Sequence, residues 1–196
     1  MNIRIYKLLN KTKVEGPGTR FCIWTQGCSK HCPQCWAKET WDFMGGKKIS
    51  VGELFNRIQN TKGIEGVTFL GGEPTEQAKA VGILAEKIQK IGLSTLVFTG
   101  QNYEDLIERN DKNISRLLKH TDLLIDGGFE VDKFDLSRPW VGSSNQRYIF
   151  LSNRYNEEDL KKYKNKVEIH IDKNGNWLIN GMGDFKTLKN KILTAR

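Results

Sequence analysis

Three apolar runs, separated by amphipathic stretches, limit what this chain can fold into. The runs are GVTFLGG (Gly66–Gly72), LSTLVFTG (Leu93–Gly100) and DLLIDGG (Asp122–Gly128). The stretches between them, from Pro74 to about Ile91 and from about Tyr103 to Leu118, have helical periodicity. Buried strands that alternate with helices indicate βαβ units around a parallel sheet. We therefore predict an α/β fold with parallel strands.

Further strands are predicted at both ends of the chain. IRIYKLL and FCIW (Phe21–Trp24) are typical of short strands. VEIHIDKNGNWLIN (Val167–Asn180) predicts a C-terminal β-hairpin that turns at Asn174-Gly175. No Pro- or Ser-rich linker divides the chain. We interpret residues 1–196 as a single domain with a C-terminal appendage from about residue 153 to residue 196.

The charge and hydropathy of the chain indicate where the protein is located and which kinds of partner it lacks. The net charge is +8, but the lysines are dispersed, as in DLKKYKNK (Asp159–Lys166). Dispersed lysines indicate a solvated basic surface and give no support to nucleic-acid binding. The longest apolar runs, such as Leu93–Phe98, are too short to cross a bilayer, and the N-terminus is too interrupted by charge for a signal peptide. We expect a cytoplasmic protein without a membrane partner.

The loop QGCSKHCPQCW (Gln26–Trp36) holds three of the four cysteines, Cys28, Cys32 and Cys35, in a C-x3-C-x2-C spacing. A structural zinc site usually takes four protein ligands, and a disulfide framework takes an even number of cysteines. Iron–sulfur clusters are held by cysteine thiolates. Three thiolates from one loop can hold three irons of a [4Fe–4S] cluster and leave the fourth iron open to another ligand.

The spacing alone leaves a zinc site open as an alternative. Its fourth ligand would be His31, His120 or His170. His31 lies between two candidate ligands, where turning inward is difficult, so we expect it to be exposed. Cys22, in the strand FCIW, is expected to be a small buried hydrophobic residue.

The residues around the cysteines carry a specific resemblance. GPGTRFCIWTQGCSKHCPQCWAKETWDFMGGKKIS (Gly16–Ser50) resembles the glycyl-radical-enzyme activases of the radical S-adenosylmethionine (SAM) superfamily. The shared features are a GxG-x-R segment, a QGC entry, the three cysteines followed by an aromatic residue, and a TWD…GG segment. DLLIDGGF and RPWVGSSNQR (Arg138–Arg147) are most similar to the short activating proteins of anaerobic ribonucleoside-triphosphate reductase. Matching blocks run from about Glu15 to Arg147.

The resemblance implies a fold and a function. A chain of 196 residues supplies an incomplete (β/α)6-type barrel, whose open side could admit a protein loop. Cys28, Cys32 and Cys35 would hold a [4Fe–4S] cluster, and SAM would bind its open iron. Reductive cleavage of SAM would give a 5′-deoxyadenosyl radical that abstracts hydrogen from a glycine of a partner enzyme. The implied partner is an anaerobic ribonucleotide reductase, with a low-potential electron donor such as flavodoxin.

Residues after the predicted strands would hold SAM if the resemblance is carried over position by position. Gly71, Gly72 and Glu73 would contact its methionyl amino group. Trp36 would either hold the adenine or shield the cluster from water. Thr99 and Asp126 would hold the ribose or the methionine end of SAM. The hydroxyls and the carboxylate of SAM would be bound by Ser143, Ser144, Asn145 and Gln146.

Two of the positions have a second possible role, and a third position differs from the family pattern. Asp126 could instead cap the turn that follows its strand, because a buried carboxylate needs a partner. Arg20 could face either the partner or the SAM carboxylate. Phe98 stands where pyruvate formate-lyase activases have an acidic residue, which argues against a cation site beside SAM.

Two other functions remain open from sequence. The chain could be a radical SAM enzyme that modifies a peptide or a small metabolite. It could also be a non-catalytic iron–sulfur or zinc module that binds a protein. Formation of 5′-deoxyadenosine separates the module from both enzymes, and the identity of the product separates the two enzymes.

Overall fold

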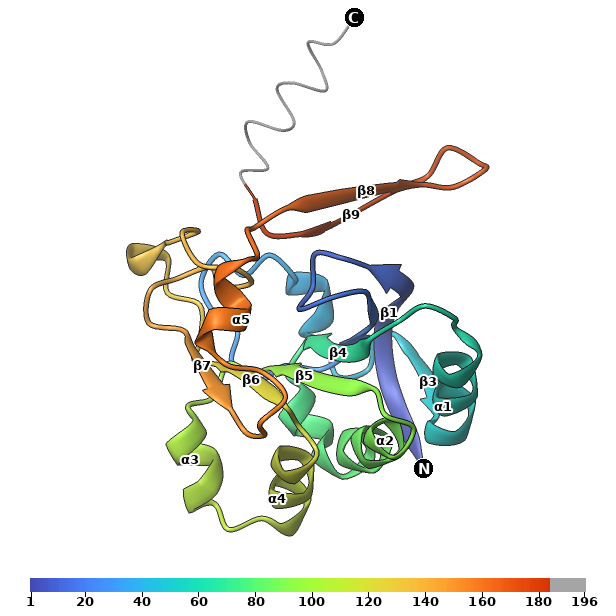
Figure 1. Ribbon diagram of the computed structural model, residues 1–196, viewed down its shortest axis with the longest axis horizontal. Helices are drawn as coiled ribbons and strands as arrows, with labels where there is room; N and C mark the ends of the chain where they lie inside the picture. The colour runs from blue at the N-terminus through green and yellow to red at the C-terminus, as the bar shows by residue number, and fades with distance from the viewer. Residues whose placement is uncertain (184–196) are drawn as a thin grey trace, which may run out of the picture.

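A seven-stranded sheet organises residues 1–183, the part of the chain that the computed structural model describes (Figure 1). Its strand order is β3-β1-β2-β4-β5-β6-β7. The centre consists of parallel strands, as the apolar runs predict, because β2 pairs with β4, β4 with β5, and β5 with β6 in parallel. These strands are β2 (Arg20–Thr25), β4 (Gly66–Gly71), β5 (Ser94–Phe98) and β6 (Leu123–Asp126).

The flanking strands correct the expectation of a sheet with parallel strands throughout. They are β1 (Asn2–Thr12), β3 (Lys47–Ser50) and β7 (Arg147–Phe150), and all three pair in the antiparallel sense. Only residues 13–19 connect β1 to β2, which is too short for the crossover that a parallel pair requires. The seven-stranded sheet is therefore mixed and rich in parallel strands.

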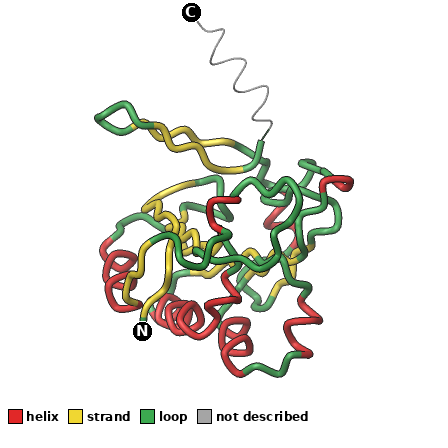
Figure 2. Tube along the Cα trace, turned by 180° about the vertical axis from the view of Figure 1, so that it is seen from behind, coloured by secondary structure: helices red, strands yellow, loops and turns green. Residues whose placement is uncertain are grey.

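Alternate side chains of the central strands enter two hydrophobic cores. Phe69, Val97 and Leu124 join the larger core, beneath α1 (Val51–Asn60) and α2 (Ala78–Lys90). On the other side of the sheet, residues including Leu96 and Ile125 pack with Trp140, Val141 and Leu160. Helices α1 and α2 therefore cover one face, and connecting segments with the short helix α5 (Glu157–Lys161) cover the other (Figures 1 and 2).

The single helix expected from about Tyr103 to Leu118 is wrong, because two helices occupy this segment. They are α3 (Tyr103–Glu108) and α4 (Lys112–Lys119). Asn110 has a φ of 50° between them, and the Asp111 carboxylate then caps α4 by accepting the backbone N–H of Asn113 at 2.6 Å. Pro74 likewise opens a 3₁₀ turn (Pro74–Gln77) that precedes α2.

The predicted C-terminal hairpin is confirmed. β8 (Val167–Ile171) and β9 (Trp177–Gly181) pair in the antiparallel sense, in a two-stranded sheet separate from the main one. The short helix α5 (Glu157–Lys161) precedes them, and the ribbon projects from the body of the molecule (Figures 1 and 2). Residues 184–196 of the predicted appendage lie outside the described residues. Within residues 1–183, none of the helices has the length and hydrophobicity that crossing a membrane requires.

Candidate active site

The cysteine loop starts where β2 ends and is fixed to its surroundings by the backbone. The Gly27 N–H donates to the Thr40 carbonyl at 2.7 Å, and the Cys28 N–H donates to the Trp41 carbonyl at 3.2 Å. The Gln26 side chain adds a hydrogen bond from its amide nitrogen to the Asp42 carbonyl at 2.7 Å. The first cysteine is therefore placed by main-chain contacts with the TWD segment.

The segment after β4 is hydrogen-bonded directly to this loop. The Gly72 N–H donates to the Thr25 carbonyl and the Glu73 N–H to the Gly27 carbonyl, both at 2.9 Å. A Cβ on Gly72 would lie 2.4 Å from the Gly27 carbonyl oxygen, so a larger residue could not approach the loop this closely. Gly71 has a φ of +98°, which glycine adopts readily. The two predicted motifs therefore form one structural unit.

The ends of the next two strands also reach the cysteine loop. A Cβ on Gly100, after β5, would lie 3.4 Å from Cγ of Lys30. A Cβ on Gly128, after β6, would lie 3.6 Å from Sγ of Cys32. Ligand sites in parallel sheets lie at the carboxyl ends of the strands. Here the ends of β4, β5 and β6 meet the cysteine loop at one edge of the sheet, as the sequence predicted.

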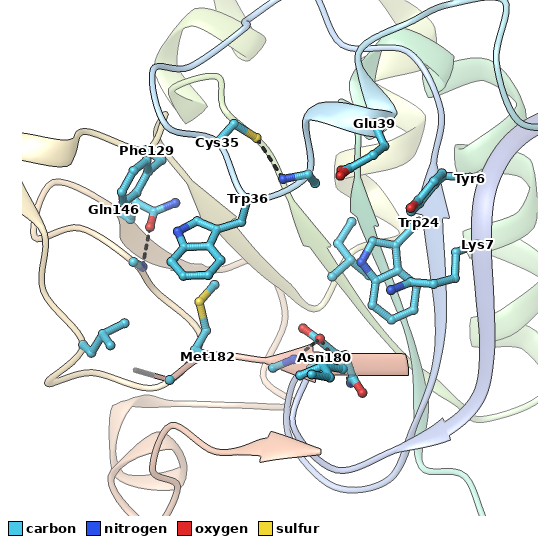
Figure 3. Close-up of a pocket in the computed structure, with 18 of the residues that line it drawn as sticks. Tyr6, Lys7, Trp24, Cys35, Trp36, Glu39, Phe129, Gln146, Asn180 and Met182 are labelled. Atoms are coloured by element: carbon cyan, nitrogen blue, oxygen red, sulfur yellow. Dashed lines mark hydrogen bonds between the residues drawn. The ribbon is translucent and has the colours of Figure 1, made fainter. Parts of the chain in front are cut away.

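Backbone amides point at two of the three sulfurs. The Ala37 N–H donates to the Cys35 sulfur at 3.4 Å (Figure 3). The backbone N–H groups of Lys30 and His31 lie at the Cys28 sulfur, where they favour its thiolate. Burial raises the pKa of Cys28, and the two amides oppose that rise. Because N–H donors stabilise a thiolate and hydrogen bonds to sulfur tune iron–sulfur clusters, this donor set fits cysteine ligands of a cluster.

None of the histidines joins the cysteines. His31 is exposed, as expected, and stacks on Trp41 with ring centroids 4.5 Å apart. Nδ1 of His120 lies 2.9 Å from the Gln89 side chain, and Nε2 of His170 lies 3.2 Å from Glu168. Within residues 1–183, no group of three or more His, Cys, Asp and Glu side chains could hold a single metal ion. A four-iron cluster makes a different demand, because each cysteine binds its own iron.

Glu73 lies buried at the junction of β4 and β5. Its carboxylate accepts hydrogen bonds from the Thr99 hydroxyl at 2.9 Å, the Gly100 N–H at 2.8 Å and the Thr75 hydroxyl at 2.7 Å. Burial raises the pKa of Glu73, and these donors act against the rise. The structure thus brings the predicted residues Glu73 and Thr99 into direct contact and uses the carboxylate to hold the two strand ends together.

Asp126 is engaged by protein groups on both carboxylate oxygens. Its Oδ2 accepts the Tyr103 N–H at the start of α3, at 2.8 Å, and lies 2.5 Å from the Arg147 guanidinium. Oδ1 accepts a second Arg147 hydrogen bond at 3.1 Å. Arg147 also contacts Glu104 on α3. Asp126 therefore caps the start of α3 rather than the turn after β6, and its contacts join α3 to β6 and β7.

The polar residues of the loop before β7 differ in exposure and in whether the protein satisfies their hydrogen bonds. Ser143 accepts the Glu130 N–H through its hydroxyl, and the Gln146 amide is bound to Gly142 and Gly127. Ser144 is exposed. Asn145 donates to the Gly128 carbonyl at 2.8 Å, but its Oδ1 is a buried acceptor without a hydrogen-bond partner among the described residues. Since buried polar atoms are normally satisfied, Asn145 Oδ1 fits a ligand hydroxyl or amino group near Gly128.

Arg20 corrects the expectation that it faces the partner or the SAM carboxylate. It lies at the opposite, amino-terminal end of the parallel strands and is completely buried. Its guanidinium donates to the Thr68 hydroxyl at 3.1 Å, the Ser94 hydroxyl at 2.5 Å and the Val67 carbonyl at 2.7 Å. Arg20 therefore ties strands together inside the sheet.

A cavity of about 440 Å³ opens beside the cysteine loop (Figure 3). Cys35 and Trp36 line it from the loop, and Trp24 lines it from β2. The exposed indole of Trp36 extends into this space above Met182 in the view of Figure 3. The sequence did not identify most of the lining, because it comes from distant segments. The additional lining residues include Tyr6, Lys7, Glu15, Phe129, Asn180 and Met182.

Burial shifts the pKa of two charged side chains in the cavity wall. Burial raises the pKa of Glu15 to about 7, although hydrogen bonds from Gly181 and Asn180 oppose the rise. Burial lowers the pKa of Lys7, against the attraction of Glu15. The Lys7 ammonium lies 4.2 Å from the centroid of the Trp24 ring, a cation–π contact. The wall thus combines aromatic surface with two ionisable side chains whose uncharged forms are favoured by burial.

Comparison with known proteins gives the family. The 4Fe-4S single cluster domain family matches residues 14–149. The anaerobic ribonucleoside-triphosphate reductase-activating protein of Pasteurella multocida is 30% identical over 142 residues, which are 68% of this chain and 88% of that protein. The chain belongs to the glycyl-radical-enzyme activases of the radical SAM superfamily.

Other activases are similar to a comparable degree. The reductase-activating protein of Escherichia coli K12 is 31% identical over 142 residues, 68% of this chain and 89% of that protein. The pyruvate formate-lyase 1-activating enzyme of the same strain is 32% identical over 152 residues, 74% of this chain but 59% of that enzyme. This chain therefore spans little more than half the length of the formate-lyase activase. The cofactors of the family are the [4Fe–4S] cluster and SAM predicted from sequence.

Proposed function

We propose that this chain is a SAM-dependent activase that generates a glycyl radical on a partner enzyme. The observation that supports this most is the junction of the cysteine loop with the Gly71–Glu73 segment, fixed by the 2.9 Å hydrogen bond from the Glu73 N–H to the Gly27 carbonyl. The junction puts three thiols beside the ends of three parallel strands. Both cofactors of a radical SAM enzyme could then bind along one edge.

Specific residues would hold these cofactors. Cys28, Cys32 and Cys35 would bind three irons, with backbone N–H groups at two of the sulfurs. When bound, the cluster and SAM supply reductive cleavage of the C5′–S bond, and hydrogen abstraction from the substrate follows from it. The chain itself would orient the two groups and limit the access of water, since the cofactors carry the bond chemistry.

The SAM assignments divide into contacting and positioning residues. The backbone of Gly71 and Gly72 would face the methionyl end of SAM, and Asn145 Oδ1 would accept a hydrogen bond from it. Glu73 and Thr99 would act through the strand ends that they hold together. Asp126 would act in the same way through Tyr103 and Arg147. Ser144 and Trp36 remain candidates for direct contact with the ribose and the adenine.

For the partner we propose an anaerobic ribonucleoside-triphosphate reductase. The chain covers 88% of one reductase-activating protein and 59% of the formate-lyase activase, at similar identities. An incomplete barrel would leave the cavity beside Cys35 open to a protein segment. We further propose that residues 1–196 act as a single domain that takes electrons from a low-potential donor such as flavodoxin. A cytoplasmic location stays a prediction.

The test is anaerobic. Reconstituted, dithionite-reduced protein should form 5′-deoxyadenosine from SAM and, with the reductase of the same source organism, a glycyl signal in electron paramagnetic resonance. No 5′-deoxyadenosine from protein with an intact cluster would overturn the proposal and favour a non-catalytic binding module. SAM cleavage without a glycyl signal, but with a modified peptide or metabolite as product, would favour the other class of radical SAM enzyme. Pyruvate formate-lyase is the comparison partner.

A further inference from the structure

The C-terminal hairpin contributes part of the wall of the cavity. Ile179, Asn180 and Gly181 of β9 line it, together with Met182. In the view of Figure 3, Asn180 lies below Trp24, and Met182 lies below Trp36. These residues lie outside the segment 14–149 that matches the family. The hairpin is therefore an addition to the matched region that reaches the space beside the cysteine loop.

Hydrogen bonds hold the base of the hairpin against the β1–β2 connection. The Glu15 carboxylate accepts the Gly181 N–H at 2.8 Å, and the Thr12 hydroxyl accepts the Asn180 amide at 2.9 Å. From β8, the Glu168 carboxylate accepts the Thr12 hydroxyl at 2.5 Å and the Lys13 N–H at 2.9 Å. The ribbon thus has a fixed orientation relative to the cavity.

The Glu168 and Asn180 side chains, on one face of the ribbon, make these contacts, and the isoleucines of the other face are 37% to 63% exposed. Ile169 pairs directly with Ile179, and Ile171 pairs with Trp177, so the four side chains share one face. We call Ile169, Ile171, Trp177 and Ile179 the apolar ribbon face. Ile171 is 63% exposed and Trp177 is 55% exposed. A contiguous exposed patch of this kind is typical of a protein interaction site, especially where an aromatic residue contributes.

The apolar ribbon face continues into the rim of the cavity. Ile179 belongs to both, and the rim adds the exposed aromatic residues Tyr6, Trp36 and Phe134. A glycine that belongs to a folded protein can enter the cavity only if the surrounding protein surface contacts this rim. The partner that delivers the glycine would then extend from the rim along the hairpin.

We propose that the apolar ribbon face is a docking surface for the glycine-bearing partner, with apolar side chains of the partner packing on Ile171 and Trp177. The inference rests on the proposed function, because it takes that partner to be the anaerobic reductase. The hairpin would thus help to select the partner, while the cysteine loop and the strand ends carry the chemistry.

The test compares two isoleucine substitutions of matched exposure. Ile171→Ser changes the apolar ribbon face, and Ile107→Ser changes an isoleucine on α3 that is 52% exposed. Affinity for the purified anaerobic reductase of the same source organism is measured anaerobically with reconstituted protein, and uncoupled SAM cleavage is measured without the reductase. Ile171→Ser should weaken binding roughly tenfold, the loss typical of a well-placed interface residue, and Ile107→Ser should not weaken it. Neither should alter uncoupled SAM cleavage.

The two proposals fail in different ways. Equal affinity of Ile171→Ser, Trp177→Ser and the unmodified protein for the reductase would overturn the docking surface, as would an unmodified protein that does not bind the reductase. Absence of 5′-deoxyadenosine from the unmodified, cluster-loaded protein would overturn the proposed function by itself. Thermal unfolding of each variant shows whether a loss of binding reflects a loss of folding.

Discussion

Glu73 and Asp126 are buried carboxylates at the ends of β4 and β6, the strands on either side of β5, and both are surrounded by protein donors. Glu73 accepts hydrogen bonds from neutral groups, including the Gly100 N–H and the Thr99 hydroxyl. Asp126 forms an ion pair with Arg147. A buried carboxylate without such partners would cost several kcal/mol. At this scale, therefore, the strand ends are held by side chains that need not touch a ligand.

Substitutions at Asp126 should separate its capping role from its charge. Asp126→Asn keeps an acceptor for the Tyr103 N–H and loses the ion pair, whereas Asp126→Ala loses both. We expect Asp126→Ala to lower the free energy of unfolding by about 1–3 kcal/mol and Asp126→Asn to lower it by less. Urea unfolding of the apoprotein measures this. Unchanged stability of Asp126→Ala, together with weaker SAM binding, would instead make Asp126 a direct SAM ligand.

Glu73→Gln should destabilise the junction of β4 and β5. The carboxylate accepts hydrogen bonds from the Thr75 N–H and hydroxyl, the Thr99 hydroxyl and the Gly100 N–H, and an amide would turn its NH2 group toward one of these donors. We expect a loss of about 1–3 kcal/mol in urea unfolding. Glu108→Gln, at the exposed end of α3, is the matched control and should have little effect. Equal stabilities of the two variants would contradict the assigned role.

At the scale of elements, strands with continuous apolar runs were predictable and short polar elements were not. β4, β5 and β6 follow their sequence signals closely. β3 has the sequence KKIS, and β7 begins with the exposed Arg147, so neither resembles a buried strand. The α3–α4 break was missed because the periodicity continues across it. Its signals were Asn110, which tolerates a positive φ, and Asp111, a common helix cap.

The attachment of the hairpin should depend on pH through Glu15. Burial raises the pKa of Glu15 from 4.5 to about 7. Between these values the folded protein retains a proton that the unfolded chain has released, so the free energy of unfolding falls as pH rises through this window. Glu15→Gln keeps an acceptor for the Gly181 N–H and removes the titration. We therefore expect the unmodified protein to lose up to about 3 kcal/mol relative to Glu15→Gln as pH rises from about 4.5 to about 7.

Urea unfolding at a series of pH values measures this difference. Other titrating groups, Glu73 among them, are common to both proteins and cancel in the comparison. Parallel stability curves for the unmodified protein and Glu15→Gln would show that Glu15 keeps its ordinary pKa. A difference that increases with pH in favour of the unmodified protein would indicate that Glu15 is stabilised in its charged form by Lys7.

At the scale of the whole molecule, the hydrophobic cores cover the two faces of the sheet, and the candidate site lies apart from them at the carboxyl ends of the parallel strands. The position of the site was predictable because parallel strands end at a common edge, and the cysteine loop follows one of these strands. The contacts of Arg20 and the lining of the cavity were not predictable. Arg20 binds Ser94, which lies 74 positions away in the sequence, and the cavity wall joins β1, β2 and β9. The pattern of residues along the sequence does not indicate which distant residues come into contact.

This separation predicts opposite effects for two cysteines. Cys32 lies in the loop and is partly exposed, whereas Cys22 is fully buried in β2 and burial raises its pKa well above the ordinary value. Cys32→Ala should abolish cluster assembly, seen as loss of the iron–sulfur absorbance, and leave the stability of the apoprotein unchanged. Cys22→Ala should retain the cluster and lose about 1 kcal/mol of stability by leaving a small cavity. The reverse assignment of these effects, or normal SAM cleavage by Cys32→Ala, would remove Cys32 from the ligand set.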